Sequence, residues 1–386
     1  MSVLPDRNAS VAPGMQPDVQ ATGKTYRFDR SYEWNYVNGP DYHGPWPAVP
    51  DTPMKSFFGL PVRSRFGIPA SILPNSRWLE TYARLGFDIL TYKSVRRVAR
   101  ACMPAPNWVF LEEASLAPSM RDPDQPVVLA GELYRAPSMH TTGGSFGMPS
   151  MLPEIWMAEM EKCRAALAPG QVLIASVVGT AAADVSEAQF VADFADLGAR
   201  AIEAGAHMLE VNLSCPNVGK AEGTLYLDAD LSSRVARAVK KASGGRPLLL
   251  KSGVIRDPLH FLKLLKGVSG AADGLVMINA PSRRIVDAAG AEAFGAGRER
   301  AGVTGAAIKP LALDMVKQAV ALIDLHKLPL QVIGCGGITA PGDARQFVAA
   351  GACAALSATG AMLNPHLAVE LKALAPDLYR ALAPDL

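Results

Sequence analysis

Cysteine is scarce in this sequence, and its cysteines are not closely paired. The five cysteines include no Cys-x-x-Cys pair, so neither a disulfide framework nor a cysteine-built zinc or iron–sulfur site is expected. The six histidines show no metal-ligand spacing either, and we predict no metal site. The chain also lacks a Walker loop and any Gly-x-Gly-x-x-Gly that both follows a strand and opens a helix. A Rossmann-type cofactor site is therefore not supported.

An excess of charge of one sign is also missing. Lys and Arg number 38 and Asp and Glu 36, so a net charge of +2 provides no strong field to hold nucleic acid or an anionic membrane. No apolar run approaches the roughly 20 residues of a membrane span. The first residues have no basic segment followed by an apolar run, so no signal peptide is predicted. Since 49% of the residues are hydrophobic, a large core is possible, and we expect a soluble cytoplasmic enzyme.

Residues 1–60 differ in composition from the rest of the chain. They contain nine aromatic residues and eight of the 30 prolines. The five aromatic residues between positions 26 and 36 all fall on even positions, a strand-like alternation: Tyr26, Phe28, Tyr32, Trp34 and Tyr36. This segment cannot form a core alone, and we expect an extended arm that lies on the main domain or on a second subunit. Packing for stability, a lid over the active site and a contact in a homodimer all remain open as its role.

Residues 61–386 alternate between short β-rich runs and longer helical segments. Strands are predicted near residues 66–72, 87–92, 172–178, 207–212, 247–251, 274–279, 330–334 and 354–357. Helices are predicted between them, at residues 77–85, 153–166, 186–204, 231–242, 258–266, 310–323, 341–349 and 365–374. Asn75, and Asp257 followed by Pro258, are typical helix start signals.

Eight strand–helix alternations predict a single (β/α)8 barrel, the TIM-barrel fold, with the arm as an N-terminal extension. A doubly wound sheet is the competing architecture. The barrel is favoured because the units continue to the C-terminus without a break in composition. The polar and glycine-rich segments also all follow strands, and in a barrel these positions form one mouth.

The fourth predicted strand ends in an unusual polar run, Asn212-Leu213-Ser214-Cys215-Pro216-Asn217. A carboxamide offers both a donor and an acceptor, so Asn212 and Asn217 can hold a cyclic amide or imide. Cys215 at the barrel mouth can act as a base or nucleophile if its pKa falls from about 8.5. A buried structural thiol is the other reading of this cysteine.

Two lysines and a third carboxamide also end predicted strands. Lys93 follows Leu90-Thr91-Tyr92, and Lys251 follows Leu248-Leu249-Leu250. A lysine at a strand end faces the mouth, where its ammonium can stabilise negative charge on a ligand. Asn279 ends the sixth strand.

The last two predicted strands lead into phosphate-binding signals. Gly336 and Gly337 follow the seventh strand, and Ala358 and Thr359 follow the eighth. Such turns expose backbone N–H groups, and barrels often bind phosphate between these two loops.

Taken together, these motifs resemble the dihydroorotate dehydrogenases, FMN-dependent (β/α)8 barrels that also include the pyrimidine-reducing domain of dihydropyrimidine dehydrogenase. The resemblance covers about residues 60–375, and its most specific part is the run 212–217. Supporting matches are the runs Thr91-Tyr92-Lys93-Ser94, Gly302 to Pro310, Ile333 to Ile338, and Gly351-Ala352 leading to Thr359.

The resemblance implies a role for each matching residue. Cys215 matches the base, while Lys93 matches a lysine near both the flavin and the substrate carboxylate. The ring of a pyrimidine is implied to be held by Asn212, Asn217 and Asn279. Apart from the resemblance, the backbone N–H groups of Phe146, Gly147 and Met148, together with Lys93, can receive a carboxylate. FMN is implied to contact Lys93, Ser94, Lys251, Gly305, Gly336, Gly337, Ala358 and Thr359.

Two positions depart from the family pattern. Gly144 stands where the family has an asparagine, and Ala280 stands where it usually has Ser or Thr. The leading prediction is oxidation of dihydroorotate to orotate or a related reaction at a CH–CH bond of a cyclic amide. The alternatives are a related flavoenzyme of specialised metabolism with another substrate, a non-catalytic flavin-binding module, and a phosphate-binding barrel isomerase without flavin. The electron acceptor cannot be read from the sequence.

Overall fold

Eight parallel strands form a closed barrel at the centre of the computed structural model, which describes residues 25–112, 116, 119, 120, 122–131, 140–214 and 223–374. The barrel strands are β3 (Phe66–Ile68), β4 (Ile89–Val95), β8 (Val172–Val177), β9 (Met208–Asn212), β10 (Leu248–Ser252), β11 (Gly274–Met277), β14 (Gln331–Cys335) and β15 (Ala354–Leu356). Each pairs in parallel with the next, and β15 pairs with β3 to close the ring. The predicted (β/α)8 barrel is confirmed, and the doubly wound sheet is excluded.

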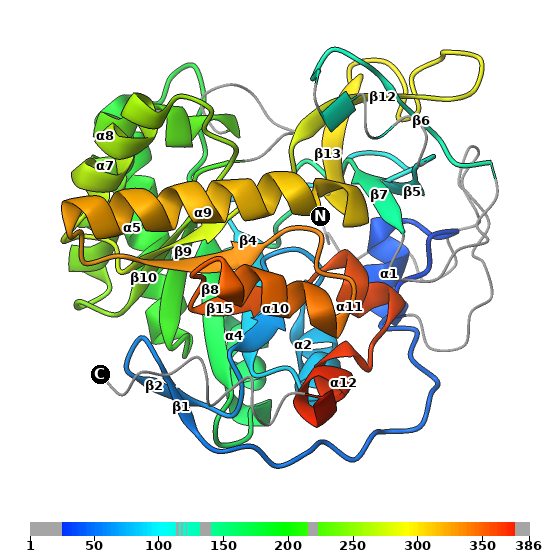
Figure 1. The fold of residues 1–386 in the computed structure, drawn as a ribbon. Coiled ribbons are helices and arrows are strands. Elements are labelled where there is room, and N and C mark those ends of the chain that lie inside the picture. Colours follow the sequence, from blue (N-terminus) through cyan, green and yellow to red (C-terminus); the bar gives the residue numbers. More distant parts are fainter. Residues whose placement is uncertain are drawn as a thin grey trace.

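Helices cover the outside of the barrel, and each predicted helix has a counterpart (Figure 1). They are α2 (Ser76–Arg84), α4 (Pro153–Ala166), α5 (Glu187–Glu203), α7 (Ala229–Ala242), α8 (Pro258–Val268), α9 (Lys309–His326), α10 (Pro341–Ala349) and α12 (Leu367–Leu374). The predicted start signals function as caps: Asn75 accepts from the backbone N–H of Trp78, and Asp257 accepts from that of Leu259. These local bonds satisfy donors that a helix leaves open at its first turn.

A second sheet, which was not predicted, is built from the two longest connections between barrel strands. Its order is β5-β7-β13-β12-β6. The strands are β5 (Trp108–Phe110), β6 (Val127–Val128), β7 (Thr141–Gly144), β12 (Ser282–Val286) and β13 (Arg300–Gly305). Because β5–β7 follow β4 and β12–β13 follow β11, the sheet lies on the C-terminal side of the barrel strands (Figure 1). It therefore forms one wall of the barrel mouth.

The opposite end of the barrel is closed by a small hairpin of β1 (Lys55–Phe57) and β2 (Leu60–Val62). The side chains of Phe57 and Val62 are buried in one cluster with Ile89 and Val172, which begin β4 and β8. Apolar side chains thus fill this end, and the space for a ligand lies at the other end.

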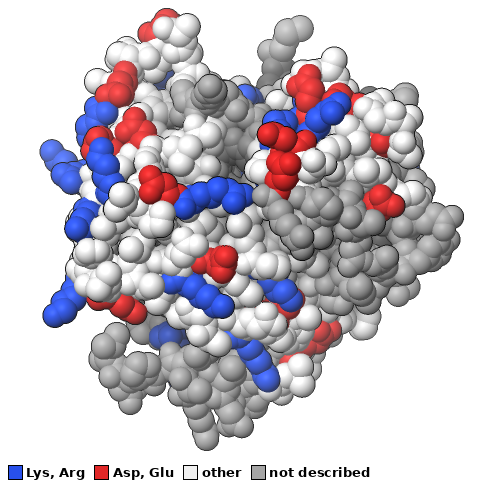
Figure 2. Space-filling view, turned by 45° about the horizontal axis from the view of Figure 1, so that its top comes forward, with Lys and Arg blue, Asp and Glu red and all other residues white. Residues whose placement is uncertain are grey.

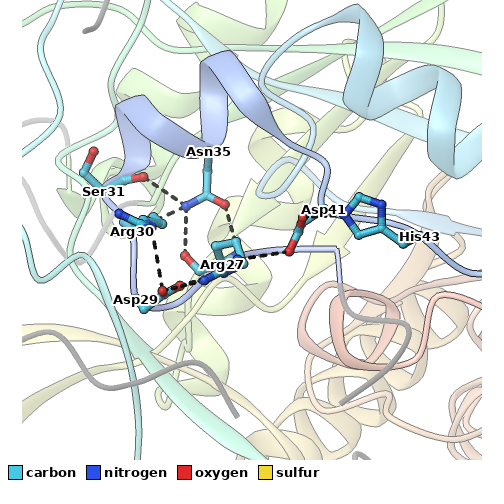
Figure 3. Close-up of polar contacts among 7 residues, drawn as sticks. All are labelled: Arg27, Asp29, Arg30, Ser31, Asn35, Asp41 and His43. Atoms are coloured by element: carbon cyan, nitrogen blue, oxygen red, sulfur yellow. Dashed lines mark hydrogen bonds and ion pairs between the residues drawn. The ribbon is translucent and has the colours of Figure 1, made fainter. Parts of the chain in front are cut away.

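The strand-like alternation predicted for the aromatic arm is wrong, because residues Tyr32–Asn38 form helix α1. Ser31 caps the helix by accepting from the N–H of Trp34. The buried carboxamide of Asn35 accepts from the N–H of Arg27 and donates to the carbonyl of Ser31, both over 2.9 Å (Figure 3). These local hydrogen bonds outweigh the alternation of aromatic side chains. They can form because residues four positions apart, such as Ser31 and Asn35, lie on the same side of a helix.

Charged groups around the preceding turn reinforce this start of the helix. Asp29 pairs with Arg27 over 2.6 Å and lies 3.7 Å from Arg30 (Figure 3). Before the turn, the rings of Tyr26 and Phe28 are buried; Tyr26 contacts Trp78 and Phe28 contacts Phe110. This part of the arm is therefore bound to both the helical layer and the second sheet.

Charges of both signs are interspersed over the face of the molecule drawn in Figure 2. Among the described residues, no helix combines the length and the apolar character that a membrane crossing requires. No cluster of three or more potential metal ligands occurs within those residues either.

Candidate functional site

Two adjoining cavities lie at the C-terminal ends of the barrel strands. The carboxamide cavity is bounded by Lys93, Ser94, Phe146, Met148, Asn212 and Asn279. The glycine cavity is bounded by Lys251, Gly305, Gly336, Gly337, Ala358 and Thr359. Asn279, Thr304 and Ser71 line both cavities and form a shared wall. Barrel closure thus brings together residues that the sequence spreads over more than 250 positions.

The carboxamides of Asn212 and Asn279 contact each other in the first cavity. Asn279 Nδ2 donates to Asn212 Oδ1 over 3.2 Å and also to the carbonyl of Ser214. Asn212 Oδ1 accepts a second bond from the N–H of Ser214, and its Nδ2 donates to Ser94 Oγ, both over 3.2 Å. Such a network holds both side chains in one orientation before any ligand arrives.

Lys93 reaches the same cavity from β4 with its ammonium between two aromatic rings. Its Nζ lies 4.8 Å from the ring centre of Phe146 and 5.1 Å from that of Tyr32, which belongs to α1. It also donates to the carbonyl of Ser71 over 3.2 Å. These contacts keep a positive charge at the cavity wall, where it can meet a carboxylate.

The loop after β7 carries unusual backbone at the cavity. Gly147 has φ of 74° and Met148 has φ of 53°. Positive φ at methionine costs of the order of 1 kcal/mol or more and is typical of loops shaped for a ligand. The carbonyl of Met148 accepts from Arg96 Nε over 3.4 Å, and that of Phe146 accepts from the N–H of Met103 over 3.1 Å. These bonds tie the loop to Arg96 and Met103, and Phe146 and Met148 line the carboxamide cavity.

The second cavity is shaped by glycines that no other residue can replace without movement. A Cβ on Gly337 (φ 78°) would lie 2.5 Å from Lys309 Cβ, and one on Gly305 (φ 95°) would lie 2.4 Å from the carbonyl oxygen of His140. Among the described residues, the backbone N–H groups of Gly336 and Gly337 donate to no protein acceptor. Unused donors in a glycine-lined cavity fit an anionic group such as a phosphate.

Lys251 enters the floor of the glycine cavity from β10. Its Nζ lies 3.1 Å from Cys335 Sγ, and the side chain is almost fully buried. The neighbouring carboxyl of Glu210 is completely buried. Burial raises the pKa of Glu210, while the Lys251 charge and the Ser176 hydroxyl act in the opposite direction. Lys251 lines the glycine cavity, and Glu210 is buried beside it without lining the cavity.

All but one of the predicted site residues that the structure describes line one of the two cavities; the exception is Gly147, which lines neither and packs against Met103. Lys93, Ser94, Asn212, Asn279, Phe146 and Met148 line the first cavity, and Lys251, Gly305, Gly336, Gly337, Ala358 and Thr359 line the second. Cys215 and Asn217 lie outside the described residues.

Three residues that contact the lining of these cavities were not identified from the sequence. Glu210 and Ser176 were passed over inside apolar strands, although Glu210 lies two residues before Asn212 and a strand turns such residues to the same side. Tyr32 was counted only among the aromatic residues of the arm. No local signal shows that it would contact Lys93.

Comparison with known proteins agrees with this architecture. The family model for dihydroorotate dehydrogenase matches residues 144–374. A solved structure of the dihydroorotate dehydrogenase of Eimeria tenella in complex with ferulenol matches with a TM-score of 0.65, over 87% of this chain and 88% of that chain. Its sequence identity is 18%, so this likeness concerns the fold alone.

Curated relatives extend the match over most of the sequence. The chain is 34% identical over 361 residues to the dihydroorotate dehydrogenase of Dictyostelium discoideum, covering 89% of this chain and 95% of that protein. It is 37% identical over 186 residues to the catalytic subunit of dihydroorotate dehydrogenase B (NAD(+)) of Maridesulfovibrio salexigens, which covers 46% of this chain and 57% of that subunit. The chain therefore belongs to the dihydroorotate dehydrogenase family of flavin-dependent oxidoreductases.

Proposed function

We propose that this protein oxidises dihydroorotate to orotate with FMN as its cofactor and Cys215 as the catalytic base. The observation that carries the proposal is the contact between Asn212 and Asn279 in a cavity that shares a wall with the glycine cavity. A pyrimidine ring needs paired donors and acceptors along its amide edges, and a flavin must lie against that ring. Family membership supports the same pairing of ligands.

The glycine cavity fits FMN in its chemistry. The N–H groups of Gly336 and Gly337, which have no acceptor within the described part of the chain, line one cavity with Ala358 and Thr359 and suit a phosphate. Lys251 would lie beside the flavin ring and stabilise negative charge on it, while Gly305, Lys93 and Ser94 complete its surroundings. FMN, when bound, would supply N5 as the acceptor of hydride from the substrate.

The remaining residues of this chain bind the substrate and move its proton. Cys215, as thiolate, would take the proton from the ring carbon next to the carbonyl. Ser214, the residue before it, has its N–H bound by Asn212 and its carbonyl bound by Asn279. The residue directly before Cys215 is therefore held by both carboxamides. Asn217 would then be the third carboxamide on the ring.

The carboxylate of the substrate would be bound by Lys93 and by the backbone of residues 146–148. The Lys93 ammonium lines the cavity next to this loop. A charge-assisted hydrogen bond from an ammonium to a carboxylate is roughly twice as strong as a neutral one. This anchor would select a ring that carries a carboxylate over one that does not.

A related cyclic amide is the second candidate substrate. Gly144 and Ala280 both line the carboxamide cavity, and neither side chain offers a hydrogen bond. The space beyond Gly144 is partly taken by Phe146, whose Cε2 would lie 3.1 Å from an added Cβ. Loss of two polar partners favours a substrate with fewer amide groups to satisfy.

We also propose that residues 1–60 form an arm that completes the site and that residues 61–386 form one FMN-binding unit. Support comes from Tyr32, whose ring lies 5.1 Å from Lys93 Nζ. A lid of this kind would exclude water from the hydride transfer. The homodimer and the cytoplasmic location remain predictions, to be checked by light scattering and by cell fractionation.

An absorbance spectrum of the purified protein, repeated without oxygen after adding dihydroorotate or dihydrouracil, tests the proposal. We expect a flavin spectrum that dihydroorotate bleaches. Bleaching by dihydrouracil alone would favour the second substrate class, and a flavin that neither compound bleaches would favour a non-catalytic module. A colourless protein that binds sugar phosphates would favour a barrel isomerase. Turnover by Cys215→Ala at the wild-type rate would refute the assigned base, whereas Cys215→Ser should retain measurable activity.

A further inference from the structure

A chain of hydrogen-bonded side chains connects the barrel interior to the carboxamide cavity. Ser176 Oγ on β8 donates to Glu210 Oε1 on β9 over 2.9 Å. The hydroxyl oxygens of Ser176 and Ser94 are 2.9 Å apart, and Asn212 Nδ2 donates to Ser94 Oγ over 3.2 Å. All four side chains are buried, with exposed fractions of 6% or less. We call this chain the Glu210 relay.

The donor direction along the Glu210 relay is determined by its buried end. A serine hydroxyl has one hydrogen to donate. Because the hydroxyl hydrogen of Ser176 is donated to Glu210, Ser94 must be the donor in the hydrogen bond between the two serines. Ser94 is then left with oxygen lone pairs only, so it is the amide nitrogen of Asn212 that has to face it.

The orientation of Asn212 passes on to the next carboxamide. With its nitrogen toward Ser94, Asn212 turns Oδ1 to the other side, where it accepts from Asn279 Nδ2 and from the N–H of Ser214. Asn279 in turn accepts from the N–H of Ala280 with its own Oδ1 over 2.8 Å. With Glu210 as the acceptor inside the barrel, only one orientation of the Asn212 and Asn279 carboxamides satisfies all of these hydrogen bonds.

Glu210 is suited to be that fixed acceptor. Its Oε2 has no hydrogen-bond partner among the described residues, so Ser176 is the one side chain that binds the carboxyl there. Lys251 is the charged group that faces it and helps to compensate its burial. Ser176 donates to Oε1, which is therefore the acceptor at this end of the relay.

We propose that Glu210 is a positioning residue for the substrate: through Ser176 and Ser94 it determines which edge of the Asn212 carboxamide faces the ring. This inference rests on the proposed function, because it takes the ligand of the carboxamide cavity to be a pyrimidine. Glu210 lines neither the carboxamide cavity nor the glycine cavity, and the hydrogen bonds that lead from it end at Asn212. Its effect is therefore expected on ring binding, with little effect on flavin binding.

Glu210→Gln tests the relay because it preserves size but adds an NH2 group that can donate to Ser176 and reverse every bond. We expect the Kd of orotate to rise about tenfold, while the Kd of FMN changes less than about threefold. Ser176→Ala interrupts the relay while the acid itself stays in place, and it should weaken orotate binding to a similar extent. Since both act through one chain, the double variant should bind orotate no more weakly than the poorer single variant.

Asp88→Asn is the matched control, because it makes the same change at a buried acid beside a lysine at the other end of the barrel. Asp88 precedes β4 and lies 2.8 Å from Lys372 Nζ. Asp88→Asn should lower the unfolding temperature and leave orotate affinity unchanged. Its effect on stability should add to that of Glu210→Gln. Unchanged orotate affinity in Glu210→Gln, or additive losses with Ser176→Ala, would overturn the positioning role. If Glu210→Gln does not fold, Ser176→Ala and Asn212→Ala carry the same non-additivity test.

A failure of the proposed function would be recognised separately. It would show in the wild-type protein as absence of both FMN and orotate binding. The relay would then be measured without ligand, by a double-mutant cycle of Ser176→Ala and Asn212→Ala on the free energy of unfolding. Coupling between the two changes supports the relay, and strict additivity overturns it.

Discussion

Asn279 Nδ2 lies 3.2 Å from Asn212 Oδ1, although the two residues are 67 positions apart in the chain. One follows β11 and the other ends β9, and β10 separates these strands in the barrel. The contact therefore exists because the barrel curves and brings the two strand ends across its mouth. It fixes two carboxamides as a pair, which is the feature that recognises a cyclic amide.

Asn279→Ala should weaken the binding of orotate without unfolding the protein. The change removes one carboxamide from the ring site and takes one of two donors from Asn212 Oδ1. A lost or unpaired hydrogen bond of this kind costs about 1–3 kcal/mol, or roughly 5- to 150-fold in Kd. Titration with orotate measures it. Asn364→Ala, which removes a hydrogen-bonded carboxamide beside α12, is the control and should leave the Kd unchanged.

Gly337→Ala should reduce FMN affinity and stability together. The added Cβ would lie 2.5 Å from Lys309 Cβ, at a residue with φ of 78° that alanine rarely adopts. We expect a loss of about 1–3 kcal/mol in the free energy of unfolding and at least about tenfold in FMN affinity. Gly342→Ala in α10 has open space around the new Cβ and should be neutral or slightly stabilising. Equal behaviour of the two variants in flavin titration would contradict the assignment of the cavity.

Tyr32→Leu should lower kcat/KM for dihydroorotate if the arm completes the site. Lys93 Nζ loses one of the two rings that hold it, an interaction of about 0.5–2 kcal/mol, or roughly 2- to 30-fold. Tyr32→Phe keeps the ring and should behave like the wild type. Tyr42→Leu changes an arm residue that packs on His366 instead, and should affect stability alone. If Tyr32→Leu is as active as Tyr42→Leu, the arm has no role in the site.

His207 should make the protein less stable as the pH falls from about 6.5 to 4. Burial, aided by Arg164 and Arg246, lowers the pKa of His207 to about 4, and its neutral Nδ1 accepts from the N–H of Leu173 over 2.9 Å. In the unfolded chain the histidine binds a proton near pH 6.5, whereas the folded protein binds it only near pH 4. Protonation therefore stabilises the unfolded state increasingly over the folded state as the pH drops through this window. Because the ring is only partly buried, we expect a loss of about 1–2 kcal/mol.

Chemical denaturation of the wild type and His207→Asn between pH 7 and pH 4 measures this term. Asparagine keeps an acceptor near the position of Nδ1 but does not titrate, so the slope with pH should become shallower. His43→Asn removes an exposed histidine and serves as the control. Parallel pH profiles of the wild type and His207→Asn would rule out His207 as the cause.

The sequence alone was sufficient for the barrel and for much of its mouth. Strand and helix periods depend on neighbouring residues, and so do caps such as Asn75 and Asp257. Because the barrel topology puts the C-terminal ends of all its strands on one face, residues near the ends of different strands, such as Lys93 and Asn279, could be assigned to one site in advance. Local rules failed at α1, where capping by Ser31 and the bonds of Asn35 outweighed the alternation of aromatic side chains.

Tertiary structure alone decided which of these residues touch and in which orientation. The packing of Tyr32 on Lys93, the second sheet over the mouth and the path from Glu210 to Asn212 all join distant parts of the chain. Such contacts depend on how strands stagger as the barrel closes and on which buried polar groups must find partners. Neither the stagger nor the partners can be predicted from a local sequence pattern, because a hydrogen bond between β8 and β9 does not change the periodicity of either strand.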